Sequence, residues 1–196
     1  MFTGIIEDTG VIVNLNKEGT NLHFTIESEI ASELKPDQSV AHNGVCLTVV
    51  SALGNRYSVT AVDETLQKTN LGKSKIKDIV NLERSILLTS RVDGHFVQGH
   101  VDGMCMIKKI EDKNGSHLFT FDIGKNDQGL LVQKGSVCIN GVSLTVVDCG
   151  RRFFSVAIIP YTFNHTNFKF LKEGDFVNLE FDIIGKYVSK MLESKK

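Results

Sequence analysis

The chain has 196 residues and a mass of 21.7 kDa, which allows one large domain or two small ones. Hydrophobic residues make up 41% and charged residues 23%, which excludes a wholly disordered chain, and 22 basic against 23 acidic side chains argue against binding to nucleic acid or to an anionic membrane through net charge. We find no apolar run long enough for a membrane span and no secretory signal at the N-terminus, so we expect a cytoplasmic protein.

Short strands dominate the expected secondary structure. Segments rich in Val, Thr and aromatic residues, separated by Gly, Asn and Asp, are typical of strands joined by tight turns. In the first half they predict strands at 23–28, 39–53 and 56–62, with a short helical turn at 31–36. In the second half they predict strands at 117–123, 136–148, 152–159 and 176–183, with a helical turn within 126–135.

The two halves are copies of one another. The segment SVAHNGVCLTVV at 39–50 recurs as SVCINGVSLTVV at 136–147, with nine of twelve residues identical. The same spacing of 97 residues continues to VNLE at 80–83 and at 177–180, and 20 of 45 residues match across the aligned stretch. Nearer the start of each copy the spacing is 95, so that Gly4 corresponds to Gly99. This is a tandem duplication of a unit large enough to hold its own core.

About six short strands per copy and little helix predict an all-β fold: two tandem six-stranded Greek-key barrels related by duplication. Closure into barrels removes exposed sheet edges. We expect the first barrel at 1–94, the second at 95–182, and a C-terminal helix at 183–196.

The tail has a different periodicity. Apolar residues at three- to four-residue spacing predict one stripe of a helix: Ile184, Tyr187, Val188, Met191 and Leu192. The stripe either docks on its own barrel or contacts other subunits.

Two repeated positions are candidates for chemistry. Cys46 and Ser143 occupy equivalent places, each two residues before a threonine, Thr48 or Thr145. Residues two apart share one face of a strand, so each copy presents a thiol or hydroxyl beside a second hydroxyl. If this face lines a cleft, it offers hydrogen bonds to a polar heterocycle. The adjacent Asn-Gly pairs are hairpin turn signals, so a structural role for them is at least as well supported as a binding role.

Histidines distinguish the second copy from the first. His95 and His100 lie five residues apart, on opposite faces of a strand, and no third ligand is near, so we expect no metal site. His100 corresponds to Ile5 of the first copy, which cannot titrate. The difference suits one copy that supplies proton chemistry and one that only holds ligand. The four cysteines have no zinc spacing, and we expect reduced thiols, with Cys46 more readily explained as a packed thiol than as a nucleophile.

Several separated blocks occur in the same order as in one known family. MFTGIIE, SVAHNGVCLTV, ETLQKTNLG, GHFVQGHVDG and KGSVCINGVSLTV together closely resemble the riboflavin synthase family, from Met1 to about residue 190. The resemblance implies two six-stranded barrels, a homotrimer assembled through the C-terminal helix, and lumazine synthase as a candidate partner. It also implies a reaction without a cofactor. One 6,7-dimethyl-8-ribityllumazine molecule gives a four-carbon unit to another, forming riboflavin and 5-amino-6-ribitylamino-uracil.

The same resemblance assigns site residues, with each site lying between the first barrel of one subunit and the second barrel of another. The first barrel's ligand would be held by Cys46, Leu47, Thr48, Thr60, Ala61, Val62, Asp63, Glu64, Thr65, Gly99, His100 and Val101. The second barrel's ligand would be held by Lys134, Ser143, Leu144, Thr145, Ala157, Ile158, Ile159, Pro160, Tyr161 and Thr162, with Gly4, Ile5 and Ile6 crossing towards it.

The resemblance also suggests catalytic groups: His100, Ser143, Cys46, Ser39 and Asp182, with Phe2 as a lid. We expect His100 to shuttle protons and Ser143, or a water it orients, to add to C7 of one lumazine. Some family members carry Asp where this chain has Asn140, so a carboxylate base is missing at that place and Asp182 becomes the more plausible acidic partner.

Two other classes of protein remain as alternatives. A lumazine- or flavin-binding optical protein would keep one ligand site and lose polar groups from the other. A barrel that serves only as a protein-interaction scaffold would explain the repeat but not the matching polar faces.

Overall fold

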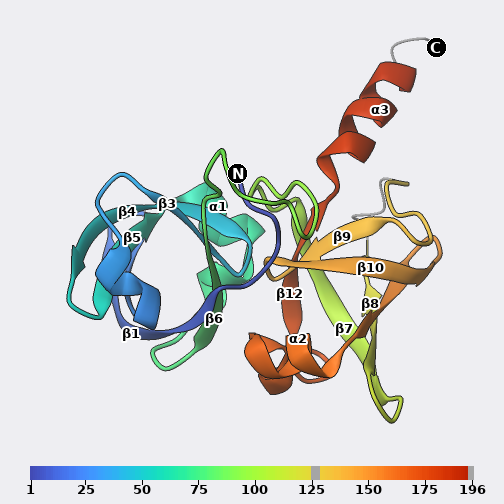
Figure 1. The fold of residues 1–196 in the computed structure, drawn as a ribbon, viewed down its shortest axis with the longest axis horizontal. Helices are drawn as coiled ribbons and strands as arrows, with labels where there is room; N and C mark the ends of the chain where they lie inside the picture. Colours follow the sequence, from blue (N-terminus) through green and yellow to red (C-terminus); the bar gives the residue numbers. More distant parts are fainter. Residues whose placement is uncertain (125–128, 194–196) are drawn as a thin grey trace.

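The computed structural model describes residues 1–124 and 129–193 and contains the two barrels that the repeat predicts (Figure 1). The N-barrel closes in the order β1-β2-β5-β4-β3-β6, and the C-barrel in the order β10-β11-β8-β7-β12-β9. The N-barrel strands are β1 (Asp8–Glu18), β2 (Asn21–Glu27), β3 (Ser39–His42), β4 (Val45–Leu53), β5 (Arg56–Ala61) and β6 (Ile79–Arg84). The C-barrel strands are β7 (Gly103–Asp112), β8 (His117–Asp122), β9 (Ser136–Ile139), β10 (Val142–Cys149), β11 (Phe153–Ile158) and β12 (Phe176–Phe181).

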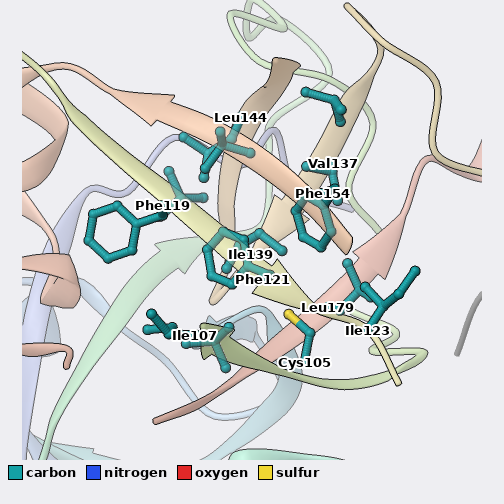
Figure 2. Close-up of a cluster of buried hydrophobic side chains, with 14 of the residues drawn as sticks. Cys105, Ile107, Phe119, Phe121, Ile123, Val137, Ile139, Leu144, Phe154 and Leu179 are labelled. Atoms are coloured by element: carbon teal, nitrogen blue, oxygen red, sulfur yellow. The ribbon is translucent and has the colours of Figure 1, made fainter. Parts of the chain in front are cut away.

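Each barrel is closed around its own apolar core. Alternating residues of the strands point inward, as in β8, where Phe119 and Phe121 are fully buried. Figure 2 shows the C-barrel core, in which the rings of Phe121 and Phe154 stack with centroids 4.9 Å apart. β4 and β10 carry register shifts at the same repeat position, between Val49 and Ser51 and between Val146 and Asp148. Such bulges bend strands and help a small sheet close.

Short helices connect the strands. A 3-10 helix at Glu29–Glu33 overlaps the helical turn predicted for 31–36. The turn predicted within 126–135 is different: residues 126–128 lie outside the described residues, and 129–135 contain a turn but no helix. The structure adds α1 (Asp63–Lys68) and α2 (Pro160–His165), which the strand pattern did not predict, and each is followed by a 3-10 turn, Asn70–Lys73 or Asn167–Phe170.

The Asn-Gly pairs form hairpin turns, and the turns also join the barrels. Asn43 and Gly44 have φ values of 48° and 79°, as a two-residue primed turn requires, and Asn140 and Gly141 match them. A Cβ built on Gly44 would lie 2.8 Å from the main-chain nitrogen of Gly141, so the two turns meet tip to tip and leave no room for a side chain.

Buried asparagines connect the barrels around this contact with two-fold regularity. The Asn81 amide donates to the Asn140 carbonyl at 2.9 Å, and the Asn178 amide donates to the Asn43 carbonyl at 2.8 Å. Asn167 donates through its main-chain N–H to Asn81 Oδ1 at 2.7 Å, and Asn70 does the same to Asn178 at 2.7 Å. Every member therefore satisfies groups of the other barrel, which fixes how the two barrels sit together.

The C-terminal helix extends away from both barrels. Over 183–193 the predicted helix is present as α3 (Ile183–Glu193), which projects past the C-barrel in Figure 1; its predicted continuation over 194–196 lies outside the described residues. Its five apolar stripe residues are 51–67% exposed, so the stripe does not dock on its own barrel. At its base Lys186 pairs with Asp102 at 2.6 Å.

Candidate active site

The repeated polar residues lie on the outer face of each barrel. Leu47 and Leu144 point into the cores, so their side chains cannot reach an outside ligand, whereas Cys46 and Ser143 are half-buried on the opposite face. Thr48 and Thr145 are exposed on that same face. The shared face predicted from two-residue spacing is therefore present in both copies.

Two segments that precede the barrels cross between them. Residues 2–5 form the first crossing segment and residues 97–100 the second, and they meet in an antiparallel bridge between Phe2 and Val97. Phe2 N–H donates to Val97 O at 2.7 Å, and Val97 N–H donates to Phe2 O at 3.0 Å. Beyond the crossing, Ile6 packs on the C-barrel core and Val101 packs on the N-barrel core. Each crossing segment therefore leads to a residue that packs on the core of the other copy's barrel.

Glycines allow the crossing segments to touch the candidate residues. Ser143 N–H donates to Gly4 O at 2.8 Å, and Cys46 N–H donates to Gly99 O at 2.9 Å. Gly4 and Gly99 have φ values of 77° and 78°, and a Cβ on either would lie 2.6 Å from the Cβ of its partner. Only glycine combines this backbone conformation with so close an approach.

The hydroxyl of Ser143 has an imidazole partner. Ser143 Oγ lies 2.7 Å from Nδ1 of His95, whose main-chain N–H donates to Thr3 O at 3.1 Å. Burial lowers the pKa of His95, and the charge of Asp182 opposes this shift. The imidazole is therefore neutral near pH 7, and with Nδ1 unprotonated it can accept the hydroxyl proton of Ser143.

The predicted proton shuttle was His100, which the resemblance assigns to the first barrel's ligand, and the histidine beside Ser143 is His95. His100 is exposed, and the segment that carries it is joined to Cys46 through Gly99, at the N-barrel. His95 sits 48 residues from Ser143 and would align before Met1 in the first copy, so the repeat comparison gave it no counterpart. The only sequence feature that marked His95 was its place next to Gly94 in the GHFVQGH block. The role of His100 stays a prediction.

Two other expected catalytic residues, Phe2 and Asp182, already make contacts within the chain. Phe2 is fully buried in a cluster with Ala41, Val97 and Cys138, so a lid movement would have to break its bridge to Val97. Asp182 Oδ1 accepts from Ile184 N–H at 3.0 Å at the start of α3.

The remaining predicted binding residues lie at the ends of β5 and β11, in the helices that follow these strands, and before β9. Thr60 Oγ1 contacts Nδ1 of His23 at 2.8 Å. Val62 and Ile159 are exposed at the start of α1 and α2, and Ala61 and Ile158 are buried. The other positions of these two stretches are half-buried or exposed: Asp63, Glu64, Thr65, Ala157, Pro160, Tyr161 and Thr162. Lys134 is exposed, with a φ of 68° in the turn before β9.

Two large cavities open on the described surface. One of about 590 Å³ lies between the barrels and is lined by Asn140, Lys73 and Phe176 among others, but by none of the predicted site residues. The second, of about 560 Å³, lies beside the N-barrel and includes Ile5 and Ser39. The first of these two cavities contains none of the predicted site residues, and the second contains only Ile5 and Ser39.

In the part of the chain that the structure covers, no cluster of three or more His, Cys, Asp or Glu side chains is placed to hold a metal ion. Within residues 1–124 and 129–193, no helix has the length and apolar character needed to cross a bilayer. All four cysteines are free thiols.

Asn140 lies in the inter-barrel network rather than at the Ser143 site. Its Oδ1 accepts from Asn178 N–H at 2.8 Å and from Asn70 Nδ2 at 3.1 Å, and it is 1% exposed. Its Nδ2 has no hydrogen-bond partner in the described structure. The residue therefore acts where the barrels join, and an acid at this position would lie among the same donors.

Comparison with known proteins supports the fold of two related barrels. The lumazine binding domain model matches twice, at residues 3–85 and 98–182. Solved structures of LumP complexed with 6,7-dimethyl-8-(1'-D-ribityl) lumazine and with riboflavin have TM-scores of 0.83 and 0.85 and cover 92% of this chain and 99% of theirs. Their sequences are 21% and 22% identical to this chain, so the structural likeness shows a shared fold alone.

Curated relatives match along the whole chain. The riboflavin synthase of Actinobacillus pleuropneumoniae is 40% identical over 196 residues, covering all of this chain and 91% of the relative. Those of Bacillus amyloliquefaciens and Schizosaccharomyces pombe are 38% and 37% identical, covering 98% and 99% of this chain and 90% and 95% of theirs. With two matched lumazine binding domains and relatives of this identity over nearly its full length, the chain belongs to the riboflavin synthase family.

Proposed function

We propose that this chain catalyses the dismutation of two 6,7-dimethyl-8-ribityllumazine molecules, as a transferase that needs no cofactor. One molecule gives a four-carbon unit to the other, and the products are riboflavin and 5-amino-6-ribitylamino-uracil. The observation that carries this proposal is the pair of like sites, one in each barrel, in a chain whose relatives are named riboflavin synthases. A repeated protein suits a reaction between two identical molecules.

Each barrel offers one molecule a polar edge. The strand faces that carry Cys46 and Thr48, and Ser143 and Thr145, present hydroxyl, thiol and main-chain groups to a heterocycle. The starts of α1 and α2 carry further exposed residues, including Asp63 and Tyr161. Ribityl hydroxyls would bind these more polar residues.

The chemistry requires a base near the C7 methyl of one lumazine and a nucleophile that adds to C7 of the other. The ring delocalises the anion left by the methyl proton, so a weak base in the right position is sufficient. We assign the nucleophile to Ser143, or to a water that it orients, and the proton acceptor for this hydroxyl to His95. Asp182 favours the protonated imidazole once the proton has moved.

Assembly would complete the site. The exposed stripe of α3 suits contact with other copies, and a homotrimer would place the N-barrel of one subunit opposite the C-barrel of the next. Such an arrangement would bring together predicted residues that neither of the two described cavities collects. A cytoplasmic location and association with lumazine synthase stay predictions.

One assay separates this function from the alternatives. Purified protein mixed with 6,7-dimethyl-8-ribityllumazine, and nothing else, should lose lumazine absorbance and gain riboflavin fluorescence. Stable binding of lumazine without turnover would instead support an optical protein. If the protein does not bind lumazine at all, the protein-interaction scaffold is the alternative that remains.

A further inference from the structure

Two buried carboxylates hold the crossing segments and are not among the predicted site residues. Glu83 on β6 and Glu180 on β12 occupy the same place in the repeat and are 3% and 2% exposed. Over the described residues, neither has a basic side chain within ion-pair distance. Burial raises the pKa of both carboxyls. A buried acid without a paired cation is costly, so its retention in both copies calls for a role.

Glu83 holds the first crossing segment. Its Oε1 accepts from Thr3 N–H at 2.6 Å and from the Thr3 hydroxyl at 2.8 Å, and its Oε2 accepts from Gly4 N–H at 2.9 Å. Glu83 belongs to the N-barrel, but Gly4 is the residue whose carbonyl accepts from Ser143 N–H of the C-barrel. Thr3 O in turn accepts from His95 N–H. Glu83 therefore contacts the two residues, Thr3 and Gly4, whose carbonyls accept hydrogen bonds from His95 and Ser143.

Glu180 holds the second crossing segment in the same way. Its Oε1 accepts from Gln98 N–H at 2.7 Å, and its Oε2 accepts from Gly99 N–H at 3.0 Å. Glu180 belongs to the C-barrel, but the Gly99 carbonyl accepts from Cys46 N–H of the N-barrel. The same arrangement therefore occurs twice: a carboxylate of each barrel holds the crossing segment that contacts the other barrel.

We propose that Glu83 and Glu180 are positioning residues that act crosswise: the N-barrel carboxylate positions the C-barrel site around Ser143, and the C-barrel carboxylate positions the N-barrel site around Cys46. The proposal rests on the proposed function for its effect on turnover, but its structural part is independent of that function. Both carboxylates are buried, and their oxygens accept from main-chain and hydroxyl groups of the crossing segments. Each holds a glycine main chain against the strand that carries the reactive side chain.

A carboxylate suits this role better than an amide. Two ionised oxygens accept three hydrogen bonds on Glu83, and charge strengthens each of them. Glutamine would turn an NH₂ group towards one of these donors and lose its bond. Glu83→Gln and Glu180→Gln therefore keep the side-chain volume and remove some of the hydrogen bonds to the crossing segment.

Local probes of each site test the crosswise arrangement. The pKa of His95, followed by NMR titration, reports on the C-barrel site, and the rate of Cys46 alkylation by iodoacetamide, followed by peptide mass spectrometry, reports on the N-barrel site. Glu83→Gln should shift the pKa of His95 and leave the alkylation of Cys46 unchanged. Glu180→Gln should raise the alkylation rate of Cys46 by about tenfold, through local opening, and leave His95 unchanged. Cys149, half-buried on β10, is an internal reference for alkylation.

Matched controls separate positioning from general loss of stability. Glu27→Gln and Glu111→Gln remove carboxylates on the outside of the N-barrel and the C-barrel, where each pairs with exposed basic residues, and should change neither probe. If Glu83→Gln fails to fold, Thr3→Val removes one of the three bonds to the carboxylate and should give a smaller shift at His95 alone. A change at both sites in each variant, a change in the same-barrel site, or no change at either site would overturn the proposal.

Turnover supplies the second readout. Each variant should lose about 10- to 100-fold in kcat, as expected for a misplaced reacting group, with a smaller change in KM and a melting temperature near that of the wild type. Wild-type KM and kcat in both variants would contradict positioning. A wild-type chain that forms no riboflavin would contradict the proposed function instead, and the two local probes would still decide the structural part.

Discussion

The imidazole of His95 and the hydroxyl of Ser143 lie 2.7 Å apart, although 48 residues separate them in sequence. Cys46 is the counterpart of Ser143, and among the described residues no histidine hydrogen-bonds to its thiol. The duplicated barrels are thus alike in fold and different in chemistry. This asymmetry is what two identical substrates with different fates require.

Removing either member of this pair should slow the reaction. We expect Ser143→Ala and His95→Gln each to lower kcat by about 100-fold, because proton transfer to a positioned base contributes on that order. The double variant should be little worse than either single variant, since the two residues act as a unit. Initial rates of riboflavin formation measure this. Ser51→Ala, which removes an exposed hydroxyl of β4 bonded to Ser58, is the control and should keep the wild-type rate.

The asparagine network should hold the barrels together. Asn81→Ala would leave the Asn140 carbonyl and the main-chain N–H of Asn167 without partners in a buried interface. We expect a loss of about 3 kcal/mol in the free energy of unfolding, from a buried polar contact with several unsatisfied groups. Asn16→Ala, at an exposed position of β1, should change it by less than about 0.5 kcal/mol. Denaturant titration of both variants measures the difference, and equal losses would contradict a structural role for the network.

His42 should make stability depend on pH. It is 1% exposed beside Tyr57, and burial lowers its pKa to about 4. Its folded pKa is below its unfolded value, so its contribution is fully present above about pH 6.5 and is lost as pH falls towards 4. The loss is on the order of 3 kcal/mol. The difference in unfolding free energy between wild type and His42→Gln should be constant above pH 7 and shrink below pH 6. A difference that stays constant down to pH 4 would contradict this.

The stripe of α3 should control assembly. Val188→Glu with Leu192→Glu places charges on exposed apolar positions, and we expect a trimer to become a monomer. Analytical ultracentrifugation measures the mass of each species. Lys190→Gln lies on the polar face of the same helix and should leave the mass unchanged. A wild-type mass near that of one chain at working concentration would contradict the trimer.

Sequence alone predicted the barrels well because the duplication repeats the strand pattern and the Asn-Gly turns mark the hairpins. It missed α1 and α2, which are only six residues long and follow directly from strands. Asp63 and Glu64 in the first turn, and Pro160 at the start, were the available signals.

The site was predicted less completely, because its contacts join distant segments. The Gly4–Ser143 and Gly99–Cys46 bonds depend on how the crossing segments pass between the barrels, which no local pattern encodes. The shared face of Cys46 and Thr48 follows from strand geometry and could be predicted. The partner of Ser143 could not, since the contact between His95 and Ser143 joins residues 48 positions apart.

The most direct test of the central claim is the stoichiometry of the reaction in the absence of any cofactor. Purified protein is incubated with 6,7-dimethyl-8-ribityllumazine, and substrate and products are separated and quantified over time. A dismutation predicts that two lumazine molecules disappear for each riboflavin and each 5-amino-6-ribitylamino-uracil formed. Lumazine that stays bound and unconsumed, or riboflavin formed without the uracil product, would contradict it.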